Sequence, residues 1–358
     1  MSILNIFLTG STGFLGGKLI NNLISGTNNE LFILVRNLEK AEKLRDQFDL
    51  EEQQRIHFIK GDITLPYCGI TEVELIQLHY SVDVFYHLAA LVKFDLDLRD
   101  DLFSVNYNGT YHALELAKRI QVNKFLYVST AYTVGKKQKG VEALYSPTDD
   151  YHNPYEESKV KSEHLVFSYA EEMDVSIFRP SIIVGDSKTG EADSEFTLYG
   201  FMRALDLFKR KVSRRPNMKN ATYRLVANKN GTSNLVPVDY VADVLSIATL
   251  NAEKNKIYNI TNPNPPKNIE LLSMLKKALA FDQLAVTEDT EQLNLNKEEE
   301  KLNGMVDIFQ VYLSGAIQFD DDHTQKLLSG TSVNHLQLTP EMIQMIMNAY
   351  FSTQLEKV

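Results

Sequence analysis

The stretch of sequence that decides the fold is "ILNIFLTGSTGFLGGKLI", residues 3–20. An apolar run is followed at once by three glycines at three-residue intervals, and a helical pattern begins at Phe14. In such a strand–turn–helix unit, the first glycine makes a sharp turn, the second lets the backbone approach a pyrophosphate, and the third lets the helix pack on the strand. The amide groups at the helix N-terminus then face the phosphates. The pattern predicts a dinucleotide-binding turn, and a turn without a ligand is the alternative. The candidate phosphate-binding residues are Gly10, Thr12, Gly13, Phe14, Leu15 and Gly16.

The rest of the first 180 residues repeats this alternation of short apolar runs and amphipathic stretches. Strands separated by helices imply right-handed crossovers and a parallel sheet. Because the runs are continuously apolar, the strands are expected to be covered on both faces. We therefore predict an α/β fold with a doubly wound parallel Rossmann sheet. The predicted strands are 3–8, 31–35, 56–59, 83–88, 124–129 and 175–178, and the helical stretches between them include 14–25, 38–48, 99–119 and 155–172.

The rhythm breaks after about residue 185, where loops lengthen and helical stretches become irregularly spaced. We predict an NADP-binding Rossmann domain over residues 1–185, to which residues 232–262 return. Residues 186–231 and 263–358 are expected to form a smaller, mostly helical lobe that caps the substrate.

Composition limits the classes of partner. The chain has 358 residues and a formal net charge of −10, which argues against a nucleic-acid-binding protein because phosphate neutralisation needs clustered Lys and Arg. Cys68 is the only cysteine, so neither a disulfide framework nor a cysteine-based metal cluster is expected. A strand predicted from residue 3 leaves no room for a signal peptide, and no apolar run reaches the ~20 residues of a transmembrane span. We expect a cytoplasmic protein without a metal.

The ends of the next strands carry candidate cofactor ligands. A site for NAD usually offers an acidic residue after the second strand, whereas this chain has Arg36 there and Lys40 one turn later. A guanidinium suits a 2′-phosphate, so the sequence favours NADPH over NADH, unless Arg36 merely faces water. Asp62 follows the third strand and is expected to accept from the adenine amino group, with Ile63 against the ring. Small side chains after the fourth strand would lie against the cofactor, namely Ala89 and Ala90.

A candidate catalytic set follows the fifth strand. Tyr155 and Lys159 have the spacing that places both side chains on one face of a helix. An ammonium beside a phenol is expected to lower the pKa of the tyrosine, which can then donate a proton to a carbonyl oxygen. Ser129 or Thr130, at the end of the neighbouring strand, can supply a second hydrogen bond to that oxygen. A solvated helix face is the alternative for the Tyr/Lys spacing.

Taken together, these residues resemble the extended short-chain dehydrogenase/reductases, over residues 3 to about 250. The phrases "TGSTGFLG", "FYHLAALVKF", "NPYEESKVKSE", "FRPSIIVGDSKTGE" and "LVPVDYVADV" are similar to the thioester-reductase and fatty acyl-CoA reductase branch, the male-sterility type. The resemblance implies that Tyr155 is the proton donor and that Lys159 holds the nicotinamide ribose. It also implies that Thr130 is the catalytic hydroxyl with Ser129 as its neighbour. The residues that would flank the nicotinamide are Pro180, Ser181 and Ile182.

The resemblance implies an NADPH-dependent reductase that converts an acyl thioester to an aldehyde or alcohol. The substrate would be an acyl-CoA or an acyl carrier protein thioester. The nine Lys and Arg residues between 203 and 229 suggest a docking site for it, with a solvated basic face as the alternative. Helices 99–119 and 155–172 would form the face of a possible homodimer. The alternatives are an extended-family oxidoreductase, epimerase or dehydratase acting on a ketone or nucleotide sugar, and a non-catalytic NADPH-binding regulatory protein.

Overall fold

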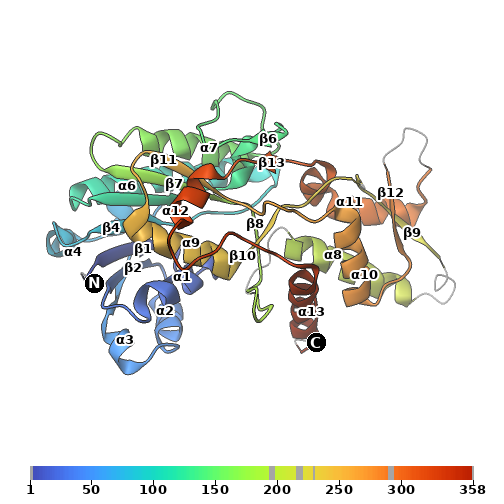
Figure 1. The fold of residues 1–358 in the computed structure, drawn as a ribbon, viewed down its shortest axis with the longest axis horizontal. Coiled ribbons are helices and arrows are strands. Elements are labelled where there is room, and N and C mark those ends of the chain that lie inside the picture. Colours follow the sequence, from blue (N-terminus) through green and yellow to red (C-terminus); the bar gives the residue numbers. More distant parts are fainter. Residues whose placement is uncertain (1–2, 193–197, 215–220, 229, 289–293, 357–358) are drawn as a thin grey trace. The chain divides into compact units, whose positions relative to one another are not determined.

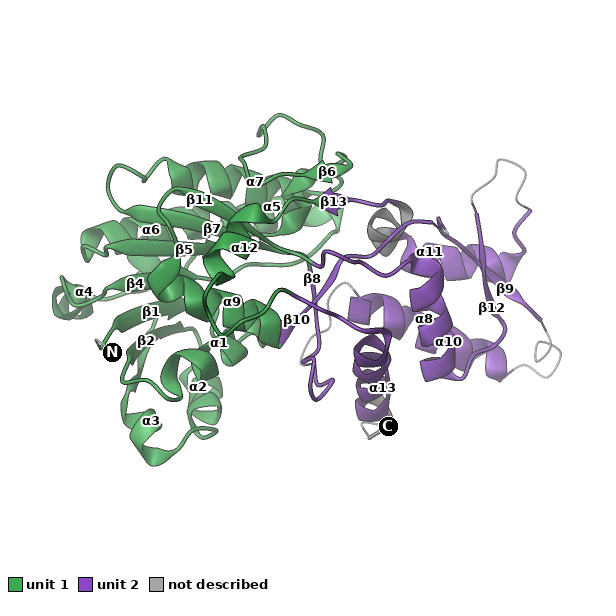
Figure 2. Cartoon of the chain, viewed as in Figure 1, with its two compact units in different colours: residues 1–181, 239–261, 319–335 green, residues 182–238, 262–318, 336–358 purple. Residues whose placement is uncertain are grey.

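The computed structural model of the chain describes residues 3–192, 198–214, 221–228, 230–288 and 294–356 (Figure 1). It divides into two compact units (Figure 2). Unit 1 comprises residues 1–181, 239–261 and 319–335, and unit 2 comprises residues 182–238, 262–318 and 336–358.

Unit 1 is built on a seven-stranded sheet in which every neighbouring pair of strands is parallel. The strand order is β11-β7-β5-β4-β1-β2-β3. The predicted α/β class and parallel Rossmann sheet are confirmed, and each of the six predicted strands is present. The seventh, β11, was not predicted as a strand. The strands are β1 (Asn5–Thr9), β2 (Glu30–Val35), β3 (Ile56–Lys60), β4 (Val84–His87), β5 (Lys124–Val128), β7 (Asp174–Pro180) and β11 (Lys256–Ile260).

Strand register explains how the core of unit 1 is filled. Phe7, Phe85 and Phe125 are aligned on neighbouring strands, and their rings stack with centroids 4.7 and 5.1 Å apart. The next residue of β4, Tyr86, points to the other face, where its hydroxyl donates to the carbonyl oxygen of Leu245 at 2.6 Å. Both faces of the sheet are therefore buried, as continuous apolar strands require.

Helices cover these two faces, with α4, α6 and α7 on one side of the sheet and α1, α2 and α9 on the other (Figure 1). The helices of unit 1 are α1 (Phe14–Ile24), α2 (Leu38–Arg45), α3 (Leu50–Gln54), α4 (Glu72–Leu78), α5 (Arg99–Leu102), α6 (Gly109–Arg119), α7 (Pro154–Phe167), α9 (Val238–Asn251) and α12 (Asp322–Leu328). Shorter helical turns are η1 (Pro66–Gly69), η2 (Leu96–Leu98), η4 (Ala131–Val134) and the π-helical η3 (Phe103–Asn108).

Residues 319–335, which the sequence pattern placed with the cap, cluster with unit 1. The reason is a set of hydrogen bonds to the edge strand β11. The side chain of Asn259 donates to the carbonyl oxygen of Asp320 at 2.7 Å, and His323 Nδ1 lies 2.8 Å from the carbonyl oxygen of Ile257. A two-residue strand pair also forms here, between β6 (Lys139–Gly140) and β13 (Gln318–Phe319).

Unit 2 is smaller and mostly helical, as predicted for this lobe. Its helices are α8 (Leu198–Ser213), α10 (Asn268–Leu279), α11 (Lys297–Ser314) and α13 (Pro340–Glu356). Two parallel strand pairs complete it, namely β8 (Ile182–Val184) with β10 (Leu235–Pro237), and β9 (Tyr223–Val226) with β12 (Leu284–Thr287).

Candidate active site

The three glycines of the turn from β1 into the first turn of α1 occupy positions where a larger side chain meets different obstacles. Gly10 has φ +77°, and a Cβ there would lie 2.5 Å from the amide nitrogen of Ala89. A Cβ at Gly16 would lie 2.4 Å from the carbonyl oxygen of Gly10. At Gly13 the nearest atom would be that same oxygen, at 3.3 Å. Gly10 and Gly16 are therefore required by the turn itself, whereas Gly13 leaves its outer side open to a ligand.

The N-terminus of α1 is suited to an anion. Gly13 is the N-cap and offers no side-chain acceptor, and the first turn of the helix carries no acidic residue. The free amide groups and the helix dipole therefore face outward unneutralised. Thr12 is exposed, and Phe14 and Leu15 are half-buried, so the backbone of the predicted phosphate site is accessible.

The predicted adenosine ligands lie after β2 and β3. Arg36 is exposed, and among the described residues its guanidinium has no hydrogen-bond or ion-pair partner. Asp62 Oδ1 accepts from the amide and hydroxyl of Thr64, at 2.9 and 2.8 Å. Ile63 is 8% exposed, and its side chain packs against Gly109 of α6, where an added Cβ would come within 2.9 Å of it. The Ile63 side chain therefore belongs mainly to the core, which leaves little of it to pack on adenine.

Three buried serine hydroxyls lie without a hydrogen-bond partner in the described part of the chain, on Ser11, Ser129 and Ser181. They follow β1, β5 and β7, and the carboxyl ends of parallel strands meet at one edge of the sheet. A buried hydroxyl without a partner costs about 1–3 kcal/mol. Such a set fits a polar ligand that supplies the missing partners, as a dinucleotide would. Ser11 was not among the sequence candidates, although its place inside the glycine turn was the available signal.

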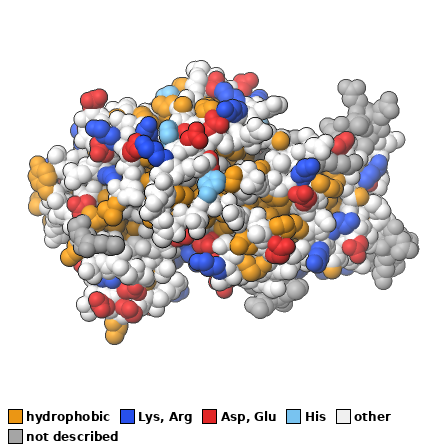
Figure 3. Space-filling view, in the orientation of Figure 1, with side chains coloured by type: hydrophobic (Ala, Val, Ile, Leu, Met, Phe, Trp, Pro, Cys, Tyr) orange, Lys and Arg blue, Asp and Glu red, His pale blue; other side chains and the backbone are white. Residues whose placement is uncertain are grey.

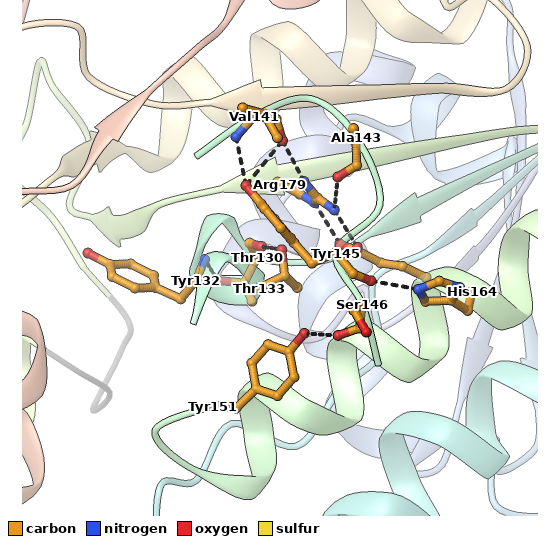
Figure 4. Close-up of polar contacts among 11 residues, drawn as sticks. Thr130, Tyr132, Thr133, Val141, Ala143, Tyr145, Ser146, Tyr151, His164 and Arg179 are labelled. Carbon is orange, nitrogen blue, oxygen red and sulfur yellow. Dashed lines mark hydrogen bonds and ion pairs between the residues drawn. The ribbon is translucent and has the colours of Figure 1, made fainter. Parts of the chain in front are cut away.

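The candidate catalytic hydroxyls come together at the start of α7. Asn153 caps this helix by accepting from the amide of Glu156 at 3.0 Å, which fixes the position of Tyr155. The side chain of Thr130, which follows β5, lies near the Tyr155 hydroxyl and lowers its pKa. Thr130 Oγ1 also accepts from the amide of Tyr132 at 3.3 Å, which sets its rotamer (Figure 4). The structure thus pairs Tyr155 with Thr130.

Lys159 lies one helical turn after Tyr155 and is 2% exposed. Its Nζ donates to the carbonyl oxygen of Val128 at 2.7 Å and lies 4.4 Å from the centre of the Tyr127 ring. Burial lowers the pKa of Lys159 to about 7. Burial also raises the pKa of Tyr155, and the Thr130 side chain opposes this only in part. The expected lowering of the Tyr155 pKa is therefore not found in the chain by itself, because desolvation is the largest influence on this phenol and the charge of Glu156 acts in the same direction.

The remaining predicted cofactor residues lie at the ends of β4 and β7. Ala89 and Ala90 are half-buried, and the Ala89 amide donates to Thr9 Oγ1 at 3.3 Å. Pro180 ends β7, and the Ser181 amide donates to the carbonyl oxygen of Ile260 at 3.1 Å. Ile182 is 8% exposed and begins β8 in unit 2.

Asn106, in the sequence "NYNGT", lies in the π-helical turn η3. Its Oδ1 accepts from the Leu91 amide at 2.7 Å, and its Nδ2 donates to the Leu91 carbonyl oxygen and to Ser158 Oγ, both at 3.0 Å. Asn106 therefore ties the segment after β4 to the helix that carries Tyr155 and Lys159.

The basic stretch of residues 203–229 is less available than its sequence suggests. Four of its cations are engaged inside unit 2, and two of them pair with acidic residues of α11 that are distant in sequence. Basic and acidic side chains are accordingly intermixed in the right-hand part of Figure 3. The pairs are Lys209 with the Leu279 carbonyl, Arg210 with Asp206, Lys211 with Glu298, and Arg224 with Glu299. Arg215, Lys219 and Lys229 lie outside the described residues.

Among the described residues, no helix combines the length and apolar character needed to cross a bilayer. Residues 8–245 match the NAD-binding male sterility protein family. The chain is 26% identical to a linear gramicidin synthase protein of Brevibacillus parabrevis, over 83% of this chain and 6% of that protein. It is 25% identical to fatty acyl-CoA reductase wat of Drosophila melanogaster, over 71% of this chain and 56% of that protein. The chain thus corresponds to only part of these relatives.

The fold is similar to that of the terminal R domain of the myxalamid PKS-NRPS pathway, with a TM-score of 0.80 and 24% identity over 99% of this chain and 92% of that domain. The family match covers more than half of the chain and includes the glycine turn, the Tyr155/Lys159 pair and the phrase after β7. The chain therefore belongs to the male sterility protein family, in the thioester-reductase branch of the extended short-chain dehydrogenase/reductases, a group of nicotinamide-dependent oxidoreductases.

Proposed function

We propose that the chain is an NADPH-dependent reductase of acyl thioesters, carried by acyl-CoA or an acyl carrier protein, and that it forms the aldehyde or, through it, the alcohol. The observation that carries the proposal is that the side chains of Tyr155 and Thr130 lie close together, one helical turn from the buried Lys159. A fatty acyl-CoA reductase among the similar proteins supports the choice of a thioester over a ketone or nucleotide sugar.

The two hydroxyls would act on the carbonyl oxygen of the substrate. The Tyr155 and Thr130 side chains lie near each other, and a carbonyl oxygen entering between their hydroxyls would accept from both. Tyr155 would donate its proton as negative charge develops on that oxygen, and Thr130 would keep its hydrogen bond. Ser129, whose buried hydroxyl has no partner among the described residues, would offer a further donor to the nicotinamide end of the site.

The cofactor would be held along the carboxyl edge of the sheet. The α1 amides would receive the pyrophosphate, Asp62 the adenine amino group, and Ser11 and Ser181 would gain partners for their hydroxyls. Bound there, the nicotinamide would supply a hydride to the acyl carbon. We propose NADPH rather than NADH because Arg36 follows β2 where NAD sites have an acid, and Lys40 lies within one turn of it.

The reaction balances as one thioester, one NADPH and one proton giving one aldehyde, one thiol and NADP⁺. The test is to mix the purified chain with NADPH and a panel of acyl-CoA and acyl-carrier thioesters while following nicotinamide absorbance and free thiol. We expect NADPH oxidation with thiol release, in a ratio of one for an aldehyde product and two for an alcohol. Oxidation with ketones or nucleotide sugars but not with thioesters would overturn the assignment. Binding of NADPH without turnover of any of them would leave a non-catalytic protein.

A further inference from the structure

Three buried side chains of alternating charge lie on α7 and β7. They are Lys159 and Glu163 on α7 and Arg179 on β7. Lys159 and Glu163 are four residues apart on α7 and therefore lie on one face of the helix. Lys159 is 2% exposed, and Glu163 and Arg179 are fully buried. The signs alternate from Lys159 to Glu163 to Arg179. None of the three is screened by bulk water, so their mutual interactions are strong.

The Arg179 guanidinium is held on all sides. Its Nε donates to Glu163 Oε1 at 2.8 Å, and one terminal nitrogen donates to Glu163 Oε2 at 2.5 Å. The guanidinium also donates to the carbonyl oxygens of Val141 and Ala143, at 3.0 Å each, and its carbon lies 4.7 Å from the centre of the Tyr145 ring (Figure 4). The Glu163 carboxylate is therefore fixed in place one turn after Lys159.

The other groups that face Lys159 in the described part of the chain are neutral. His87 on β4 is buried between the hydroxyls of Thr9 and Thr110, and burial together with Lys159 lowers its pKa to about 3. Burial raises the pKa of Tyr127 on β5 and of Tyr155 on α7, so both phenols keep their protons. The carbonyl oxygen of Val128 is an uncharged acceptor. Glu163 is the anion that acts on Lys159, and it opposes the desolvation of the ammonium.

We propose that Glu163 and Arg179 are positioning residues that set the charge of Lys159. The Glu163 carboxylate stabilises the ammonium, and the Arg179 guanidinium limits that stabilisation by partly neutralising the carboxylate. The inference rests on the proposed function only in that the reductase would use the Lys159 ammonium to hold the nicotinamide ribose. The charge balance itself is a property of the chain without ligands.

Two substitutions are therefore expected to move the Lys159 pKa in opposite directions. Glu163→Gln removes the anion and leaves Arg179 positive, so the Lys159 pKa should fall by about one pH unit or more. Arg179→Gln leaves the carboxylate uncompensated, so the Lys159 pKa should rise. A purely structural role for the pair predicts loss of stability in both variants and no such opposition.

The pKa is read without turnover, from the ¹³Cε chemical shift of Lys159 in protein labelled with [ε-¹³C]lysine, titrated from pH 5 to 10. The Lys159→Met variant assigns the signal. Glu157→Gln is the matched control, because Glu157 lies on the same helix but pairs with Arg99 and Lys161 and is two residues from Lys159. This control should leave the Lys159 titration within about 0.3 pH units of the wild type, since i,i+2 side chains do not face each other.

Arg179→Gln leaves a buried carboxylate unpaired, a change that strongly destabilises proteins. The Glu163→Gln/Arg179→Gln double variant avoids this and keeps the comparison decisive. Adding Arg179→Gln to Glu163→Gln removes a cation, so it should raise the Lys159 pKa relative to the single Glu163→Gln variant. Two comparisons of the Lys159 pKa are decisive: wild type with Glu163→Gln, and Glu163→Gln with the double variant. Shifts of the same sign in the two comparisons, or no shift in either, would overturn the inference. Opposite shifts without thioester reduction would leave the inference standing and reject the proposed function.

Discussion

The Nζ atom of Lys159 donates to the carbonyl oxygen of Val128 at 2.7 Å, one residue before Ser129, whose hydroxyl has no partner among the described residues. This bond anchors the amine to the end of β5, in a place where burial lowers its pKa to about 7. The lysine and the two hydroxyl-bearing residues Ser129 and Thr130 are thus fixed to the same strand end.

The buried amine should make stability depend on pH. The folded-state pKa of Lys159 lies below its unfolded value near 10.5, so between about pH 7 and 10.5 the unfolded chain binds the extra proton. In that window, the stability of the wild type relative to Lys159→Met should rise by about 1.4 kcal/mol per pH unit. Below pH 7 the difference should be constant. Urea denaturation of both proteins from pH 6 to 9.5 measures it, and a flat difference would contradict a depressed pKa.

Tyr155→Phe should lower kcat for thioester reduction by about 10²–10⁴, because it removes the proton donor. The Kd for NADPH should change by less than about threefold, since a lost hydroxyl without a cofactor contact leaves binding intact. Tyr169→Phe is the control, because this tyrosine lies just beyond the same helix and its hydroxyl donates to Glu115 at 2.6 Å. Near-normal kcat in Tyr155→Phe would remove Tyr155 from the mechanism.

Ser181→Ala and Ser11→Ala should affect the free and the NADPH-bound protein in opposite ways. Each removes a buried hydroxyl without a partner in the described structure, so the free protein should gain about 1 kcal/mol. If the cofactor supplies the missing partner, the same variants should bind NADPH several-fold more weakly. Thermal unfolding with and without NADPH reads both effects.

Ser158→Ala is the contrast to these two serines. Its hydroxyl is equally buried but donates to the Tyr155 carbonyl oxygen at 2.8 Å and accepts from Asn106 at 3.0 Å. Removing it should destabilise the free protein. Equal losses of stability in all three variants would contradict the absence of hydrogen-bond partners for Ser11 and Ser181 in the described structure.

Gly16→Ala should destabilise the chain and abolish tight NADPH binding, because its Cβ would lie 2.4 Å from the Gly10 carbonyl oxygen. The neighbouring Gly17 is the matched control, since the nearest atom to an added Cβ is Leu44 Cδ1 at 3.9 Å. Gly17→Ala should therefore stabilise α1 by about 0.5–1 kcal/mol. Equal tolerance of alanine at both positions, measured by denaturation and cofactor titration, would be inconsistent with the close turn.

Arg36→Ala should raise the Kd for NADPH about tenfold or more, because a charged hydrogen bond contributes about 1.5–3 kcal/mol. The Kd for NADH, which lacks the 2′-phosphate, should hardly change. Arg45→Ala is the control, because Arg45 pairs with Glu42 on the solvent side of α2. An equal loss of both cofactors in Arg36→Ala would show that Arg36 does not read the phosphate.

Patterns of neighbouring residues were sufficient to predict single strands and the residues that share a helix face. Six strands could be located because buried parallel strands are continuously apolar, and the Tyr155/Lys159 pair because four residues make about one helical turn. The strand β11 was missed because Asn259, a buried polar residue, interrupts the apolar run in "KIYNI". Residues 319–335 were assigned to the cap because their hydrogen bonds to β11 join segments that are distant along the chain. The local sequence pattern does not indicate such contacts.

By itself, the sequence determined the α/β class, the glycine turn and the candidate catalytic residues, because these depend on neighbours within one strand or helical turn. The tertiary structure alone decided which hydroxyls lack partners within the described part of the chain, that Glu298 and Glu299 neutralise cations of the basic stretch, and that Arg179 pairs with Glu163. It also decided that burial, more than the neighbouring charge, governs the protonation of Tyr155 and Lys159. These properties depend on which distant residues exclude water from a side chain, and that exclusion exists only once the chain has folded.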